Sequence, residues 1–288
     1  MHLHIDGDVV KYRAGFAAEK MHHYLTEDGI EIHFDYKKEL NEHVKLAGLK
    51  EGEYTIRAER IAEPVENALH NVKSIIEDIC KDMGVTLNDI TVYLSGPSNF
   101  RTSIGDICYR DKPVQGYKAH RKEAHRPVHG PAIVEYIKRH YNYVDTVDEE
   151  ADDAMGIAQY AMWLTDPEST CIVTVDKDLD MIPGYHYNWP KKDQYFVDAH
   201  SADMVFWRQL LTGDSTDNIP GLEGIGPKTA LKLLPDPLPD EYAYMVALGQ
   251  YEEKYAEEAA ECLLENARMI WIRREKNEFW NPPEKEVE

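Results

Sequence analysis

The chain has 288 residues, of which 43% are hydrophobic and 30% charged, and its formal net charge is -21. This length is enough for a sizeable core, in one large domain or in two unequal ones. The sequence has no apolar run near the roughly 18 residues of a membrane span, and its first residues do not form a secretion leader. Four scattered cysteines without CxxC spacing predict reduced thiols, so we expect a cytoplasmic protein without a membrane partner.

Several short stretches have the pattern of β-strands. The run "LHI" before Asp6 is apolar and leads into a glycine. Residues 90–96 and 171–176 are β-branched and bounded by turn residues, which predicts buried parallel strands. Residues 22–35 contain two β-prone runs about an Asp-Gly pair and predict a hairpin.

Helices are expected between and after these strands. Apolar residues recur at helical spacing in 63–84, and helical stretches follow near 131–140 and 150–164. Beyond about residue 200 the pattern is helical throughout. We therefore predict an α/β domain over 1–200, with a mostly parallel central sheet flanked by helices, and a helical region over 201–288.

The acidic average conceals a basic segment, residues 101–130. It holds seven Lys or Arg against three acids, with prolines, glycines and little apolar periodicity. Local potential matters more than net charge for binding phosphate. We expect this segment to be mobile alone and to become ordered around a nucleic-acid strand, although a solvated basic loop is the simpler alternative.

Acidic residues gather in four clusters, which are Asp6 with Asp8, residues 149–153, residues 176–180, and Asp214 with Asp217. Asp6 and Asp176 each follow a predicted strand, and open α/β sheets bind ligands at that edge. Converging carboxylates repel one another unless a cation lies among them, and oxygen ligands select Mg²⁺ or Mn²⁺. Two such ions about 4 Å apart can hold a phosphodiester. Any single cluster could instead cap a helix or form a turn.

A glycine turn lies in the stretch "GIGPKT", residues 224–229. We expect Pro220-Gly221 to end one helix and Pro227 to begin the next. Glycines allow a phosphate to approach the backbone, while Lys228 and Thr229 add a charge and a hydroxyl. A plain αα-hairpin is the alternative.

These motifs, in this order, resemble those of the flap endonuclease and 5′→3′ exonuclease family, especially its stand-alone bacterial and bacteriophage members. The resemblance runs from residue 1 to about 235 and is carried by "IDGD", "YKAHR", "EADD", "TVDKDLD" and "GDSTDNIPGLEGIGPKTA". It implies a PIN-like nuclease domain with a helical arch over 101–130 and a helix–three-turn–helix (helix-hairpin-helix) over 213–234.

The resemblance also implies functional residues. The implied metal ligands are all acidic: Asp6, Glu150, Asp152, Asp153, Asp176, Asp178, Asp214 and Asp217. Lys118 and Arg121 are implied to be catalytic, through contact with the reacting phosphate. The implied DNA contacts are Arg101, Tyr117, Lys118, Arg121, Lys122, Gly224, Gly226, Lys228 and Thr229. The implied cofactors are two Mg²⁺ ions, or Mn²⁺ in their place, and a monovalent cation at the 221–226 turn is a further candidate.

The implied activity is that of a structure-selective 5′-nuclease, which hydrolyses DNA phosphodiesters from or near 5′ ends by a two-metal-ion mechanism. It would act in DNA replication as a 5′→3′ exonuclease, a flap endonuclease or both, with RNA primer removal as a related role. We expect a monomer whose partners are DNA with 5′ ends, flaps or nicks, or an RNA–DNA hybrid. Its location would be the host cytoplasm if a phage encodes it.

One departure and two alternatives remain. Family members often carry another Asp after the second strand, where this chain has Ser95-Gly96, and Asp8 and Asp180 are candidates to offset the loss. "DGDVV" also fits a haloacid-dehalogenase-like phosphohydrolase, with Asp6 as nucleophile and Asp8 as acid/base. A non-catalytic DNA-binding relative is the other alternative, and it predicts damaged acidic motifs.

Overall fold

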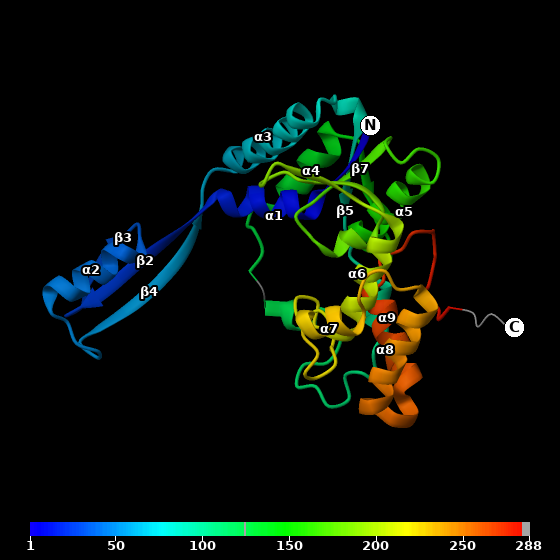
Figure 1. Cartoon of the computed structure of the whole chain (residues 1–288). Helices are drawn as coiled ribbons and strands as arrows, with labels where there is room; N and C mark the ends of the chain where they lie inside the picture. The colour runs from blue at the N-terminus through cyan, green and yellow to red at the C-terminus, as the bar shows by residue number, and fades with distance from the viewer. Residues whose placement is uncertain (124, 284–288) are drawn as a thin grey trace, which may run out of the picture. The chain divides into compact units, whose positions relative to one another are not determined.

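The computed structural model describes residues 1–123 and 125–283, with the side chains of residues 122 and 123 excepted, and the chain forms two compact units (Figure 1). The first unit contains residues 1–9, 79–125 and 141 onward. The second contains residues 10–78 and 126–140. Within the described residues, no helix is both long and apolar enough to cross a membrane.

The first unit is built on a six-stranded sheet with the order β6-β5-β1-β7-β8-β9. Its strands are β1 (His2–Asp6), β5 (Ile90–Leu94), β6 (Tyr143–Asp145), β7 (Thr170–Val173), β8 (Gly184–Asn188) and β9 (Asp193–Val197). All neighbouring pairs are parallel except β8 and β9. The predicted α/β class with a mostly parallel sheet is confirmed, and so are the strands expected at "LHI", 90–96 and 171–176. These strands are apolar runs because the central ones are buried on both faces.

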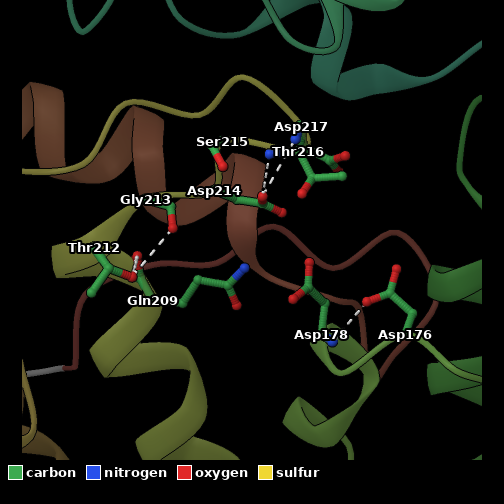
Figure 2. A pocket seen from close by; sticks show the side chains of 9 residues that line it. All are labelled: Asp176, Asp178, Gln209, Thr212, Gly213, Asp214, Ser215, Thr216 and Asp217. Atoms are coloured by element: carbon green, nitrogen blue, oxygen red, sulfur yellow. Dashed lines mark hydrogen bonds between the residues drawn. The ribbon is translucent and has the colours of Figure 1, made fainter. Parts of the chain in front are cut away.

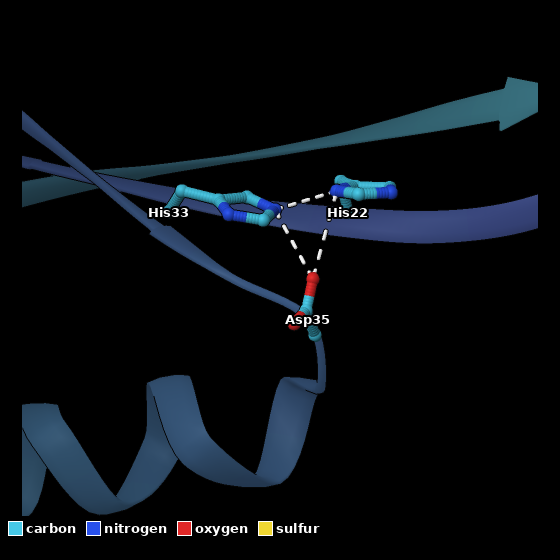
Figure 3. A group of neighbouring side chains, drawn as sticks. All are labelled: His22, His33 and Asp35. Atoms are coloured by element: carbon cyan, nitrogen blue, oxygen red, sulfur yellow. Dashed lines mark hydrogen bonds and ion pairs between the residues drawn. The ribbon is translucent and has the colours of Figure 1, made fainter.

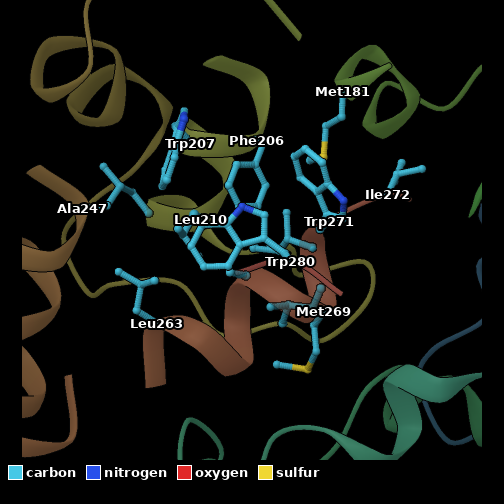
Figure 4. Packing of buried hydrophobic residues seen from close by; sticks show 14 of the residues in the cluster. Met181, Phe206, Trp207, Leu210, Ala247, Leu263, Met269, Trp271, Ile272 and Trp280 are labelled. Carbon is cyan, nitrogen blue, oxygen red and sulfur yellow. The ribbon is translucent and has the colours of Figure 1, made fainter. Parts of the chain in front are cut away.

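Several α-helices also belong to this unit. They are α5 (Ala151–Trp163), α6 (Ala199–Thr212), α7 (Pro227–Leu233), α8 (Asp240–Tyr255) and α9 (Ala259–Ile270). Phe206 and Trp207 of α6 pack against Trp271 and Trp280, which follow α9 (Figure 4).

The hydrophobic core of the first unit is continuous across the predicted domain boundary at residue 200. The cluster that contains Phe206 also contains Ile172 of β7 and Met181. The prediction of helices after residue 200 is confirmed. The predicted division at that residue does not coincide with the two compact units, since the later helices share one hydrophobic cluster with the sheet.

The basic segment does not form the expected helical arch. Among its described residues before Gly130 there are 3-10 turns at Phe100–Ser103 and Ala119–Glu123 and no α-helix. Cys108, Tyr109 and Tyr117 are buried in the hydrophobic cluster. The expectation that this segment lies wholly outside the core is therefore corrected, because its aromatic and thiol side chains pack inward, while its mobility without DNA stays a prediction.

The second unit holds a three-stranded antiparallel sheet with the order β3-β2-β4. The strands are β2 (Glu19–Glu27), β3 (Ile30–Phe34) and β4 (Tyr54–Ala62), and the helices are α2 (Lys37–Ala47) and α4 (Gly130–His140). The unit boundaries fall within α1 (Gly7–Ala17) and α3 (Val65–Met83). The expected hairpin is confirmed, and Asp28 and Gly29 both have positive φ, as a two-residue hairpin turn requires. The helices expected at 63–84, 131–140 and 150–164 correspond to α3, α4 and α5.

Candidate functional site

The carboxyl ends of β1 and β7 carry the first acidic side chains of the candidate site. Asp6 ends β1 and is 3% exposed. Its Oδ1 accepts a hydrogen bond from Val9 N at 2.9 Å, and its Oδ2 accepts one from Thr174 Oγ1 at 2.8 Å. Thr174 Oγ1 in turn accepts a hydrogen bond from Asp176 N at 3.1 Å. Thr174 was not singled out from the sequence, yet its hydroxyl fixes both Asp6 and the loop after β7.

The start of α5 brings further acids to this edge. Glu150 is the N-cap residue, and Asp152 lies in the first turn. Burial, together with the charges of Asp6, Glu150 and Asp176, raises the pKa of Asp152 well above its usual range. Burial and the neighbouring Asp8 raise the pKa of Asp6 to about 6. Asp6, Glu150 and Asp152 thus form one group of carboxylates, with Asp176 beside it.

A second group lines an open pocket of about 290 Å³ (Figure 2). Its carboxylates are those of Asp176, Asp178, Asp214 and Asp217. Asp214 Oδ1 accepts a hydrogen bond from Thr216 N at 2.7 Å, which shapes the loop after α6. Burial and the charges of Asp176 and Asp214 raise the pKa of Asp178 to about 8. Asp176 therefore adjoins both carboxylate groups.

Two cations of the basic segment contact these acids. Lys118 Nζ lies 2.5 Å from Glu150 Oε1 and 3.2 Å from Asp217 Oδ2. Arg121 Nη2 donates to Asp217 Oδ1 at 2.6 Å, and its Nε donates to Thr216 O at 3.0 Å. Although burial acts to lower the pKa of Lys118, the carboxylates of Glu150 and Asp217 raise it above its ordinary value. Lys118 therefore stays charged at the site.

The backbone around Lys118 is held in an uncommon conformation. Lys118 has φ of 52°, in the left-handed region that non-glycine residues adopt infrequently. Its N–H donates to Asp217 O at 2.8 Å. Asn218 Nδ2 donates to the carbonyls of Val114 and Gly116 at 3.2 and 2.8 Å. Asn218, which was not singled out from the sequence, thus joins residues 114–116, just before Lys118, to the loop after α6.

Two residues expected to contact DNA are enclosed by protein. Tyr117 is buried, and its hydroxyl lies 2.6 Å from Glu150 Oε2 and 2.8 Å from Asp217 Oδ2. Arg101 is 2% exposed, and its guanidinium donates to Asp153 and to the carbonyls of Met269 and Trp271. The polar atoms of both residues already bind protein groups, and their assignment as direct DNA contacts stays a prediction.

Asp153, another expected metal ligand, is likewise enclosed by protein groups. It is fully buried, and its oxygens accept hydrogen bonds from Arg101 Nη1 at 2.5 Å and Nη2 at 2.7 Å. Arg273 N and Glu150 N also donate to it, at 3.2 and 3.1 Å. Although burial acts to raise the pKa of Asp153, the Arg101 guanidinium lowers it below its usual range. Asp153 therefore neutralises the buried Arg101 guanidinium, whereas Asp152 lies among the other carboxylates.

The glycine turn is an exposed surface. Gly224, Gly226, Lys228 and Thr229 are all exposed, and α7 begins at Pro227, as predicted. A Cβ built on Gly226 would meet nothing within 4 Å, so a ligand can approach its backbone. The preceding helix was placed wrongly. α6 ends at Thr212, because residues 214 and 219 form a β-bridge that closes the intervening loop. The side chain of Lys122 lies outside the described residues.

Ser95 and Gly96 follow β5 at the position where family members often carry another Asp. A Cβ on Gly96 would lie 2.0 Å from Thr146 O, so the backbone leaves no room for a side chain. Ser95 N donates to Asp8 Oδ2 at 3.1 Å, which brings the Asp8 carboxylate to the end of β5. Asp180 instead accepts a hydrogen bond from Tyr195 Oη at 2.7 Å. Of Asp8 and Asp180, the two candidates to replace the missing Asp, only Asp8 is thus hydrogen-bonded to the residue that follows β5.

The donor chemistry of the two groups fits hard divalent cations. The site offers carboxylate oxygens, with no histidine or cysteine among them, and burial makes their charges costly without a counter-ion. Within the described part of the chain, no three of these acids bring one oxygen each within 4.8 Å of one another. Lys118 and Arg121 are the cations that neutralise Glu150 and Asp217 in this arrangement.

Comparison with known proteins identifies relatives by sequence. No family model matches the chain. DNA polymerase I of Rhizobium leguminosarum is 31% identical over 53% of this chain and 15% of that protein. A 5′-3′ exonuclease of Streptomyces coelicolor is 33% identical over 44% of this chain and 50% of the relative. Flap endonuclease Xni of Shewanella sediminis is 24% identical over 64% and 74%.

The chain thus matches a small part of the polymerase and half of the exonuclease. A solved structure of T5 5′-exonuclease with bound divalent metal ions (zinc) is 16% identical, covers 93% of this chain and 88% of its own, and has a TM-score of 0.50. This likeness shows that the fold is shared. The two sequence relatives named 5′-3′ exonuclease and flap endonuclease confirm the resemblance to the flap endonuclease and 5′→3′ exonuclease family.

Proposed function

We propose that the chain is a metal-dependent 5′-nuclease that hydrolyses DNA phosphodiester bonds at or near 5′ ends. One observation carries the proposal, namely the contact of Lys118 and Arg121 with Glu150 and Asp217. These contacts place two side chains able to bind phosphate beside acids from the start of α5 and from the loop after α6, at one edge of a parallel sheet. The names of the relatives, a 5′-3′ exonuclease and a flap endonuclease, support it.

The carboxylates would hold two Mg²⁺ ions, or Mn²⁺ in their place. Asp6, Glu150 and Asp152 would supply oxygens to one ion, and Asp178, Asp214 and Asp217 to the other, once their side chains draw together around it, with Asp176 next to both groups. Such a pair of cations supplies an activated water and stabilises the leaving oxygen of a phosphodiester. The bound divalent ions in the T5 5′-exonuclease structure support this cofactor class.

Lys118 and Arg121 would hold the reacting phosphate. The ammonium of Lys118 is a point charge, and the guanidinium of Arg121 can donate two parallel hydrogen bonds to phosphate oxygens. Tyr117, whose hydroxyl lies between Glu150 and Asp217, orients these carboxylates. Positive groups held in place where negative charge develops in the transition state lower the activation barrier of the reaction.

The exposed turn at Gly224 and Gly226, with Lys228 and Thr229, would bind the DNA backbone. Contacts of this kind position a duplex without reading its bases, so affinity should fall as salt rises. The proposal includes a monovalent cation at the 221–226 turn. It also includes a monomeric, cytoplasmic enzyme that acts on 5′ ends, flaps or nicks, and on the RNA–DNA hybrids of primers.

The test is cleavage of labelled blunt, nicked, gapped and 5′-flap duplexes in Mg²⁺ and in EDTA. We expect cleavage in Mg²⁺ only, and its loss in Asp176→Asn. Asp180→Asn is the matched control, because Asp180 lies in the same segment but accepts a hydrogen bond from Tyr195. Undiminished cleavage in EDTA, or by Asp176→Asn, would refute the proposal.

The same samples separate the alternatives. DNA binding without cleavage would indicate a non-catalytic relative. Beryllium fluoride trapping at Asp6 would indicate a haloacid-dehalogenase-like phosphohydrolase. The enclosure of Asp6, with each oxygen accepting a hydrogen bond, disfavours a nucleophilic role.

A further inference from the structure

The second unit carries a group of metal-ligand side chains that the proposed nuclease activity does not use. Figure 3 shows His22, His33 and Asp35 directed toward one another. His22 Nδ1 lies 2.5 Å from His33 Nε2. Asp35 Oδ1 lies 3.9 Å from His22 Nδ1 and 3.6 Å from His33 Nε2. Among the described residues, these three form the one group whose ligand atoms all fall within 4.8 Å of one another.

The strand register explains why these side chains meet. Tyr24 of β2 pairs with His33 of β3, so His22 is the diagonal neighbour of His33. Successive side chains alternate between the faces of a strand, which places His33 and Asp35 on the same side. Leu25 points to the opposite face and is buried there, whereas the imidazole group is open to solvent.

The cations near this group are paired with glutamates: Lys20 of β2 lies 2.6 Å from Glu63, although its charge also interacts with Asp35, and Arg57 is held as follows. Arg57 Nη1 donates to Glu59 at 2.6 Å, and its Nη2 donates to Glu31 at 3.3 Å. The guanidinium also lies over the Tyr24 ring, 4.0 Å from its centroid. The arginine is therefore neutralised by two glutamates, while the Asp35 carboxylate faces the imidazoles.

We propose that His22, His33 and Asp35 bind one borderline divalent transition-metal ion, Zn²⁺ being the best fit. Ligand atoms roughly 2.1 Å from a tetrahedral ion lie about 3.4 Å apart. The three observed separations, 2.5, 3.6 and 3.9 Å, span that value. Imidazole nitrogen suits Zn²⁺, Cu²⁺ and Ni²⁺, whereas Mg²⁺ prefers oxygen alone. This site is thus chemically distinct from the acidic groups, and water would complete its coordination.

The ion would fasten three elements of the second unit together. His22 lies in β2, His33 lies in β3, and Asp35 directly precedes Tyr36, the N-cap residue of α2. A ligand that binds only the folded state stabilises it in proportion to the logarithm of its concentration over the dissociation constant. Zn²⁺ should therefore raise the stability of this sheet and helix independently of DNA cleavage.

The test is calorimetric titration of Zn²⁺ into the full chain, stripped with EDTA and held in excess Mg²⁺ so that the acidic site is occupied. We compare wild type with His33→Gln and with His23→Gln, a histidine of β2 that faces the other side of the sheet. We expect wild type and His23→Gln to bind one more Zn²⁺ than His33→Gln, or to bind it at least about tenfold more tightly. Co²⁺ in place of Zn²⁺ should give a tetrahedral absorption band that His33→Gln lacks.

Equal zinc titrations for wild type and His33→Gln would overturn the proposal, and so would an equal loss in His23→Gln. Circular dichroism in EDTA checks that each variant is folded. Should His33→Gln fail to fold, His22→Gln takes its place, and the cobalt spectrum of wild type is decisive, since no tetrahedral band would mean no such site.

Discussion

The buried ion pair between Arg101 and Asp153 gives the sharpest test of the structure, because it separates a structural acid from a metal ligand. The perturbation is Asp153→Asn, which removes the charge and keeps the shape of the side chain. In the structure Asp153 is fully buried, and both of its oxygens accept hydrogen bonds from the Arg101 guanidinium. The variant therefore removes the hydrogen-bonded counter-charge of a buried arginine and leaves the carboxylate of Glu150, 3.9 Å from its guanidinium.

The magnitude follows from the burial of both partners. Removing one partner of a buried pair costs about 3–5 kcal/mol, because the other charge stays desolvated. Since a domain is typically stable by roughly 5–15 kcal/mol, the free energy of unfolding should fall by a large fraction. The double variant Arg101→Met/Asp153→Leu should recover most of the loss, because it leaves neither charge buried.

The assay is urea unfolding in EDTA, followed by the fluorescence of the tryptophans packed in the core of the first unit. Asp176→Asn is the matched control. Burial raises the pKa of Asp176, so its neutral replacement should change stability by less than about 1 kcal/mol. The reasoning is refuted if Asp153→Asn unfolds with wild-type stability yet binds Mn²⁺ more weakly, since Asp153 would then be a ligand.

Three further predictions concern the phosphate, the DNA surface and pH. Lys118→Ala should lower the single-turnover rate at saturating enzyme by at least about tenfold, or roughly 1.4 kcal/mol, and a normal rate with weak binding would make Lys118 a docking contact. Lys228→Ala should reduce the slope of log affinity against log salt by about 0.9, and Gly226→Val should weaken duplex binding without unfolding the chain; an unchanged slope or affinity would contradict these contacts. Burial lowers the pKa of His186, whose Nε2 donates to Ile182 O, so stability is complete above about pH 6.5 and falls as the unfolded chain binds a proton below it. Denaturation between pH 7 and 5 should show a smaller loss for His186→Gln, and equal losses would exclude that histidine.

The order of the acidic motifs was readable from the sequence, because each motif is local. Asp6 follows an apolar strand, and the Glu150 cluster precedes a helical stretch, so both could be assigned to the ends of elements. The positioning residues left no such signal. Thr174 and Asn218 act through hydrogen bonds to segments that lie about 100 or more residues away in the chain, at Asp6 and at Gly116.

The fold shows the same division. The hairpin about Asp28-Gly29 and the start of α7 at Pro227 were predicted correctly, because turn and cap residues impose local backbone angles. The helix before the glycine turn was extended too far. Its end is set by a bridge between residues 214 and 219, and such a contact leaves no periodicity in the sequence.

By itself, the sequence determined the α/β class, the acidic edge of the sheet and the glycine turn, because buried strands, helix caps and turns depend on residues close together in the chain. Only the tertiary structure decided which charges face each other. Arg101 and Asp153 are 52 residues apart; the basic segment suggested DNA contact for the one, and an acidic motif suggested metal binding for the other. A charged residue can enter a core when a partner meets it there, and that partner is chosen by the packing of remote segments rather than by local pattern. The same packing of remote segments buries Tyr117 and places Lys118 against the carboxylate of Glu150.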